Sequence, residues 1–228
     1  MATIIGITSQ KGGVAKSTLA RALAVKVLNA KRTVLLADLD GQRTSIEWNN
    51  RRSERKVTPN IDVRSFSNIC EVLKNIDKQD FVIVDTPSNA LGMKNNKFEK
   101  RNERFVQTLA LAKAVHLMVQ PTGPSDDDIG PGISLFNELQ NEIISENLYF
   151  ALCRHSTNTQ MITTQRKIHD AGFNTLKGVT YEHAAYTEAH NSGKSIIEDS
   201  RIAEHKSKHV NDLIESVLKI SETRKKSL

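Results

Sequence analysis

The sequence has little of what marks a secreted or membrane protein. Its two cysteines, Cys70 and Cys153, stand far apart without a C-x-x-C spacing, so we expect two buried, reduced thiols in a cytoplasmic protein. No apolar stretch approaches the roughly 20 residues that span a bilayer, and the N-terminus lacks a basic segment followed by a long apolar core. We therefore expect neither a transmembrane helix nor a signal peptide.

Internal repeats and low-complexity linkers are also lacking. A chain of 228 residues with 38% hydrophobic and 25% charged residues has the composition of a soluble globular protein with a sizeable core. We expect a single domain that comprises residues 1–228.

Strand-like and helix-like segments alternate along the chain. Short apolar runs predict strands at 3–8, 33–38, 61–65, 81–85, 115–120, 148–153 and 175–180. Segments of helical character follow most of them, at 17–30, 43–53, 68–77, 102–114 and 126–145. This alternation predicts an α/β fold with a mostly parallel, twisted sheet and helices on both of its faces.

The most informative segment is the turn between the first predicted strand and the first predicted helix. Residues 10–18 read Gln-Lys-Gly-Gly-Val-Ala-Lys-Ser-Thr. The backbone N–H groups of such a turn, with the N-terminus of the following helix, form a concave site for phosphate. Lys16 can reach the β- and γ-phosphates of a nucleoside triphosphate, and the Ser17 hydroxyl can bind Mg²⁺.

Two features separate this turn from the common phosphate-binding pattern G-x-x-x-x-G-K-[ST]. Gln10 and Ala15 occupy its two glycine positions, and Lys11 adds a positive charge at the start of the loop. What remains is K-G-G-x-x-K-[ST]. The methyl group of Ala15 predicts a backbone conformation in a region open to L-residues.

Carboxylates follow two of the predicted strands. Asp38 and Asp40 end the second strand, and Asp85 ends the fourth. Because the carboxyl ends of parallel strands meet at one edge of a sheet, where ligands bind, we expect these carboxylates beside the loop. An acidic residue in the position of Asp85, the Walker B position, orients waters on Mg²⁺.

Together these segments resemble the ParA/MinD family of ATPases, whose loop is a deviant Walker A motif. The Asp-Leu-Asp-Gly-Gln element at 38–42 is similar to the D-x-D-P-Q element of that family, with Gly41 in place of proline. A later stretch, Ser192-Gly193-Lys194-Ser195-Ile196, resembles the family's S-x-G-K-P-I. The resemblance covers nearly the whole chain. It is strongest to small ParA-type proteins without an N-terminal DNA-binding extension, because the loop begins about ten residues from Met1.

The resemblance implies a P-loop NTPase that hydrolyses ATP with Mg²⁺. It assigns the positioning of the attacking water to Asp40, and the support of Mg²⁺ to Ser17, Asp38 and Asp85. Lys11, Lys16 and Asp40 are the implied catalytic residues. The implied ATP-binding residues are Lys11, Gly12, Gly13, Val14, Ala15, Lys16, Ser17 and Thr18.

The resemblance implies a further role for Lys11, the lysine at the start of the loop. In relatives it crosses a two-fold interface and touches the phosphates of the partner's ATP. If Lys11 does the same, the active state is an ATP-dependent homodimer that dissociates when ATP is hydrolysed. The simpler alternative is a solvated loop lysine.

The charge of the chain points to an anionic partner. The net charge is +6 and the sequence pI is about 9.3, which suits non-specific contact with the phosphates of duplex DNA. Only 5% of the residues are aromatic and none interleave with the basic ones, so base stacking is not expected. A solvated basic surface is the alternative. The candidate DNA-binding residues are Arg201, Lys206, Lys208, Lys219, Arg224, Lys225 and Lys226.

Two further segments stand out. Residues 89–103 look like a polar insertion next to the γ-phosphate site. The overlapping segment 94–104 carries five basic residues. They could form a nucleotide-sensitive switch, a partner-docking loop or a surface loop without a special role. Residues 221–228 form a basic C-terminal tail.

The resemblance implies a partition ATPase associated with the nucleoid in the cytoplasm. Its ATP-bound dimer would coat DNA, and a ParB-like centromere- or cargo-binding activator would trigger hydrolysis and release, so that a plasmid or chromosome region is segregated. The alternatives are a ParA-like ATPase that positions a protein assembly, a MinD-like membrane-surface switch, and a small-molecule kinase or synthetase. The basic tail lacks the amphipathic character of MinD-like ends, so we expect no membrane partner.

Overall fold

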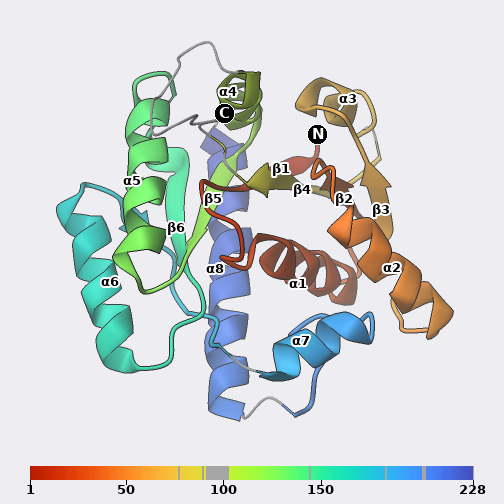
Figure 1. The fold of residues 1–228 in the computed structure, drawn as a ribbon. Coiled ribbons are helices and arrows are strands. Elements are labelled where there is room, and N and C mark those ends of the chain that lie inside the picture. The colour runs from red at the N-terminus through yellow and green to blue at the C-terminus, as the bar shows by residue number, and fades with distance from the viewer. Residues whose placement is uncertain are drawn as a thin grey trace.

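A seven-stranded sheet forms the centre of the protein (Figure 1). The structure is a computed structural model that describes residues 1–76, 78–88, 90, 103–143, 145–182, 184–201 and 204–227. All strand pairs are parallel, in the order β3-β2-β4-β1-β5-β6-β7. The strands are β1 (Thr3–Ser9), β2 (Val34–Asp38), β3 (Asp62–Ser65), β4 (Phe81–Ser88), β5 (Leu117–Thr122), β6 (Leu148–Leu152) and β7 (Asn174–Thr175).

Helices cover both faces of the sheet, as the alternating pattern predicts (Figure 1). One face carries α1 (Lys16–Asn29), α2 (Thr44–Glu54), α7 (Ala184–Asn191) and α8 (Glu204–Ser227). The other face carries α3 (Ile69–Leu73), α4 (Glu103–Ala114), α5 (Asp126–Gln140) and α6 (Asn158–Asp170). A short 3₁₀ turn, Ser145–Asn147, leads into β6.

Two hydrophobic layers result, one on each side of the sheet. Successive residues of a strand point to opposite faces, so Ile4 packs into one layer and Ile5 into the other. Both layers exclude water, which explains why the central strands are continuous apolar runs rather than alternating ones. In the described part of the chain, no helix combines the length and the apolar character needed to cross a bilayer.

The last strand, which the sequence predicts at 175–180, has only two residues in the structure. Only Asn174 and Thr175 pair with β6. Gly178 then adopts a φ of +90°, and an added Cβ there would lie 2.3 Å from the backbone nitrogen of Leu213 in α8. The chain therefore leaves the sheet to pack against α8 before the Thr180 N–H returns to the Leu152 carbonyl at 3.0 Å.

The expectation of two buried thiols is only half right. Cys153 is buried directly after β6, whereas Cys70 is exposed in the first turn of α3. Its helix turns Ile69 and Val72 towards the core instead.

Of the expected insertion, Asn89 and 91–102 lie outside the described residues, and α4 begins at Glu103. The basic segment at the C-terminus continues α8 as far as Ser227.

One buried arginine ties α2 to the segment that follows α7. Arg52 is 1% exposed and donates to the carbonyls of Pro59 (2.9 Å) and Gly193 (3.0 Å). It also binds Glu198 in a bidentate pair, with both distances 2.8 Å. The backbone at Gly193 passes so close to α2 that an added Cβ would lie 2.4 Å from the Arg52 nitrogen. The stretch 192–196 thus supports the helix that follows Asp40.

Replacing Arg52 tests whether its contacts anchor α2 to the segment after α7. We expect Arg52→Ala to lower the free energy of unfolding by about 3 kcal/mol, because Glu198 and two carbonyls lose their buried partner. Urea unfolding followed by circular dichroism measures the change. Arg55→Ala, at an exposed position just beyond the helix, is the control and should change stability by less than about 0.5 kcal/mol. Equal effects of the two variants would refute the anchoring role.

Candidate nucleotide-binding site

The phosphate-loop sequence and the predicted carboxylates meet at one edge of the sheet. The loop connects β1 to α1, Asp38 ends β2, and Asp85 lies in β4 between these two strands. In the strand register Asp85 is opposite both Asp38 and Ile7. The structure therefore brings together residues that lie up to about 70 positions apart in the sequence, such as Lys16 and Asp85.

The loop itself wraps the start of α1. Gly12 and Gly13 are exposed, Val14 is buried beneath them, and Thr18 is half-buried in the first turn of the helix. Ala15 lies just before the helix with φ 74° and ψ 24°, in the left-handed region. That region is the smallest one open to L-residues, and the methyl group costs about 1 kcal/mol there. The chain thus keeps the loop shape despite alanine.

Lys16 points from α1 to the end of β4. Its side chain is buried, and its Nζ donates to Ser88 Oγ at 2.9 Å. Burial lowers the pKa of Lys16, while Asp85 and Asp40 act in the opposite direction. An ammonium group with so little solvent gains from the arrival of an anion, which suits a phosphate ligand.

Ser45, in the first turn of α2, connects the two buried carboxylates. Its backbone N–H donates to Asp38 Oδ2 at 3.0 Å, and its hydroxyl donates to Asp85 Oδ2 at 3.0 Å. The Ser45 oxygen in turn accepts from Arg21 Nε at 3.2 Å. The other oxygen of Asp38 accepts from the Asp40 N–H at 3.0 Å. These bonds fix both carboxylates and the turn that carries Asp40.

The carboxylates fit a hydrated magnesium ion. Asp85 Oδ1 is buried and has no hydrogen-bond partner among the described residues. Burial raises the pKa of Asp85 to about 6, with a further contribution from Asp38, and burial also raises the pKa of Asp38. Two like charges in a dry site are relieved by a cation. The described residues contain no group of three or more His, Cys, Asp or Glu side chains that could hold a metal alone. The ion would therefore need the Ser17 hydroxyl, waters and phosphate oxygens as well.

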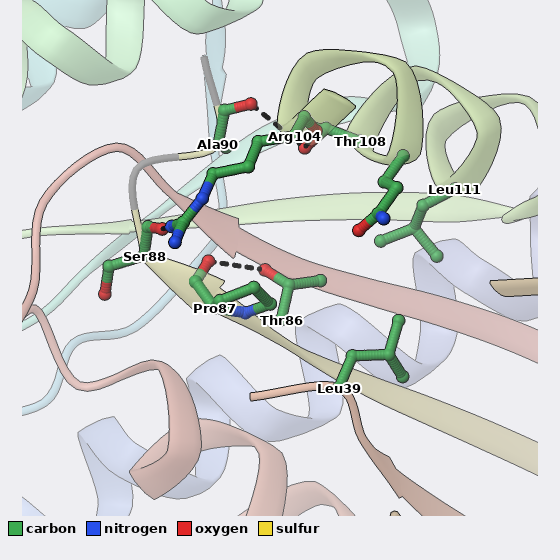
Figure 2. Close-up of a pocket in the computed structure, with 9 residues that line it drawn as sticks. Leu39, Thr86, Pro87, Ser88, Ala90, Arg104, Thr108 and Leu111 are labelled. Carbon is green, nitrogen blue, oxygen red and sulfur yellow. Dashed lines mark hydrogen bonds between the residues drawn. The ribbon is translucent and has the colours of Figure 1, made fainter. Parts of the chain in front are cut away.

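Asp40 faces an open cavity beside this pair. It is half-buried, its Oδ1 accepts from the Gln42 N–H at 3.0 Å, and the cavity has a volume of about 510 Å³. The lining residues include Ser88, Arg104 and Gln107. Figure 2 shows the adjoining pocket, in which the Arg104 guanidinium reaches the Ser88 carbonyl at 2.9 Å. The cavity thus has room for a water held by Asp40. Such a water would lie near Ser88, which contacts Lys16.

The Lys11 side chain does not lie with Lys16 but contacts α5. Its side chain is 46% exposed, and its Nζ forms an ion pair with Asp128 Oδ1 in the first turn of α5, at 2.8 Å. Lys11 is therefore at the rim of the loop, on the side of β5.

Sequence reasoning missed several residues of this site. Ser45, Ser88 and Asp128 contact the predicted residues directly, and Arg154 Nη1 donates to the Gly13 carbonyl at 3.0 Å. Ser88 is the last residue of β4, and the other three lie between two and seven residues beyond the end of a parallel strand; a polar side chain at that position is the signal that could have found them.

The predicted DNA-binding residues do not form one patch. Arg201, Lys206 and Lys208 lie near the start of α8, where Arg201 pairs with Asp199 and Glu188 and Lys206 lies over the Tyr181 ring. The others are towards or at its far end, where Arg224 pairs with Glu146 at 2.7 Å. At 1.5 Å per residue of helix, the nearest members of the two groups, Lys208 and Lys219, are separated by roughly 17 Å along α8. The second group consists of Lys219, Arg224, Lys225 and Lys226.

Comparison with solved structures gives proteins of the same fold. A plasmid partition protein from Borrelia burgdorferi is 17% identical with a TM-score of 0.64, and the match covers 96% of this chain and 98% of that one. The septum site-determining protein MinD of Pyrococcus horikoshii OT3, complexed with Mg-ADP, is 17% identical with a TM-score of 0.68, covering 98% and 99%. A ParA family ATPase from Chlorobium tepidum TLS is 15% identical with a TM-score of 0.66, covering 94% and 99%. At these identities the likeness shows the fold alone.

The comparison of sequences identifies the family. Curated protein sequences give no match to this chain. The family described as the CobQ/CobB/MinD/ParA nucleotide binding domain matches residues 5–127, which include the loop, Asp38, Asp40 and Asp85. Because the match extends over more than half of the 228 residues, this protein belongs to the CobQ/CobB/MinD/ParA family of nucleotide-binding proteins.

Proposed function

We propose that this protein is an ATP-dependent partition ATPase that forms a homodimer on binding ATP. The observation on which the proposal rests is the different burial of its two loop lysines. Lys16 is buried against Ser88, whereas Lys11 is nearly half exposed at the rim of the same loop. A single nucleotide needs only the buried lysine, so the second one is suited to the nucleotide of another subunit.

In the proposed mechanism the loop binds and neutralises the phosphates. Backbone N–H groups of Gly12, Gly13 and Lys16 would hold them, together with the Lys16 ammonium, and the Thr18 hydroxyl could donate to the α-phosphate. Ser17 would hold Mg²⁺ directly, and Asp38 and Asp85 would hold its waters; the ion supplies positive charge to the phosphates when bound. Asp40 would orient the attacking water in its cavity.

Hydrolysis would then act as a switch. Lys11 of each subunit would contribute charge to the triphosphate of the other, and loss of the γ-phosphate would weaken this contact. Release from DNA, stimulated by a cargo-bound activator, would follow from dissociation of the dimer. Plasmid or chromosome segregation and association with the nucleoid are part of this proposal.

DNA contact is favoured over a MinD-like membrane contact by the packing of α8. Its apolar residues Val210, Leu213, Ile214 and Val217 are fully or almost fully buried against the sheet. They are therefore occupied in the core, and the last turn of the helix offers Arg224, Lys225 and Lys226. Such a surface suits the phosphates of DNA better than the interior of a bilayer.

Removal of the buried lysine tests nucleotide binding. We expect Lys16→Ala to weaken binding of a fluorescent ATP analogue on the order of 100-fold, because a desolvated charge-assisted contact is lost. Fluorescence titration measures the dissociation constant. Lys113→Ala, in the last turn of α4, should leave it unchanged. Tight ATP binding by Lys16→Ala would refute the assignment of the loop.

Removal of the Asp40 carboxylate separates binding from turnover. We expect Asp40→Ala to bind ATP within about threefold of the unmodified protein but to release phosphate on the order of 100-fold more slowly. Single-turnover phosphate release measures the chemical step. Asp62→Ala, on the edge strand β3, is the matched control. Hydrolysis at the normal rate in Asp40→Ala would remove Asp40 from this role.

Co-sedimentation with non-specific duplex DNA tests the functional class. We expect binding with Mg²⁺ and a slowly hydrolysed ATP analogue, much weaker binding with ADP or without nucleotide, and a loss of affinity with rising salt. Charge reversal at Lys225 and Lys226, compared with reversal at Lys206 and Lys208, identifies the end of α8 involved. Binding that ignores nucleotide would contradict the switch, and binding to anionic vesicles but not DNA would favour the MinD-like alternative.

A further inference from the structure

The partner of Lys11 within its own subunit is a nearly buried carboxylate. The Asp128 side chain is 10% exposed, its Oδ1 contacts Lys11 Nζ at 2.8 Å, and its Oδ2 accepts from Ser125 Oγ at 2.7 Å. Burial alone would raise the pKa of Asp128, but Lys11 and Ser125 hold it below the ordinary value. Asp128 is thus a fixed negative charge with Lys11 as its ion-pair partner.

The local chain is built around this carboxylate. Gly123 lies in the turn between β5 and α5, and an added Cβ at that position would come within 2.3 Å of Asp128 Oδ2. The neighbouring acidic residues are used differently. Asp126 pairs with Lys167 on α6, and Asp127 is exposed. Of these three acids, only Asp128 contacts the phosphate loop.

The ion pair affects the use of Lys11 in the dimer. An ammonium group bound to a carboxylate must leave it, at least in part, before it can bind a phosphate at full strength. A bound triphosphate carries more negative charge than one carboxylate and can displace it. A diphosphate carries less charge and competes less well.

We propose that Asp128 is a positioning residue for Lys11, which keeps the ammonium on its own subunit until the triphosphate of a partner displaces the carboxylate. This role rests on the proposed dimer. The ion pair then sets a threshold for dimerisation, which the stronger contact with ATP passes at protein concentrations where the weaker contact with ADP does not. Because the dimer contains the pair twice, a modest effect in each subunit is squared.

Neutralising Asp128 tests the role. The Asp128→Asn amide keeps the size of the side chain and can still accept from Ser125 while it weakens the hold on Lys11. With Mg²⁺ and a non-hydrolysable ATP analogue, we expect the concentration of half-dimerisation to fall about threefold per pair, or about tenfold for the dimer. With ADP, a measurable dimer fraction should appear. Sedimentation velocity gives both values.

Three comparisons separate this role from other effects. Asp127→Asn removes the same charge one residue away at an exposed position, and it should dimerise like the unmodified protein. Lys11→Ala and the double variant Lys11→Ala/Asp128→Asn should both stay monomeric. If Asp128→Asn dimerises no more readily than Asp127→Asn while Lys11→Ala stays monomeric, the positioning role fails and the proposed function stands. If Lys11→Ala dimerises normally, or the unmodified protein never dimerises, both fall.

A second measurement examines the ion pair in the monomer without nucleotide. Trace acetylation followed by mass spectrometry reports the reactivity of each lysine amino group. Loss of its carboxylate partner should raise the labelling of Lys11 about threefold in Asp128→Asn and leave that of Lys113 unchanged. Unchanged labelling of Lys11 would show that Asp128 does not hold it in solution.

Discussion

The site depends on how the fold holds two buried carboxylates side by side. Asp38 ends β2 and lies opposite Asp85 in the neighbouring parallel strand β4, so the sheet itself places them together. Ser45 binds one through its backbone and the other through its hydroxyl, and Arg21 lies behind Ser45. Burial raises the pKa of both acids. An arrangement of this kind is costly without a cation, and Asp85 Oδ1 is buried without a hydrogen-bond partner among the described residues.

Positive charge is divided between two environments around the same loop. Burial lowers the pKa of Lys16, so a phosphate bound in the loop would stabilise its charged form. Lys11 is kept at the rim by Asp128 and stays accessible to solvent. The fold thus separates a buried charge at the proposed phosphate site from an exposed charge that another molecule can reach. This separation follows from six residues of loop and from the position of α5, and needs no further domain.

Much of this arrangement could be predicted from the sequence because it depends on local chemistry. The loop pattern, the strand runs and the carboxylates at their ends identified Lys16, Asp38 and Asp85 and the edge at which they meet. The remaining features depend on contacts between distant segments. Ser45 became visible only when α2 was packed on β4, and Asp128 only when β5 was paired with β1. The left-handed Ala15 and the early end of β7 are cases in which packing decided a conformation that local preference did not.

The most direct test of the account is the structure of this protein with a non-hydrolysable ATP analogue and Mg²⁺. We expect a two-fold dimer in which Lys11 Nζ has left Asp128 and lies within hydrogen-bond distance of the partner's phosphates. A nucleotide-bound monomer in which Lys11 remains on Asp128, or a dimer in which Lys11 points away from both nucleotides, would contradict it.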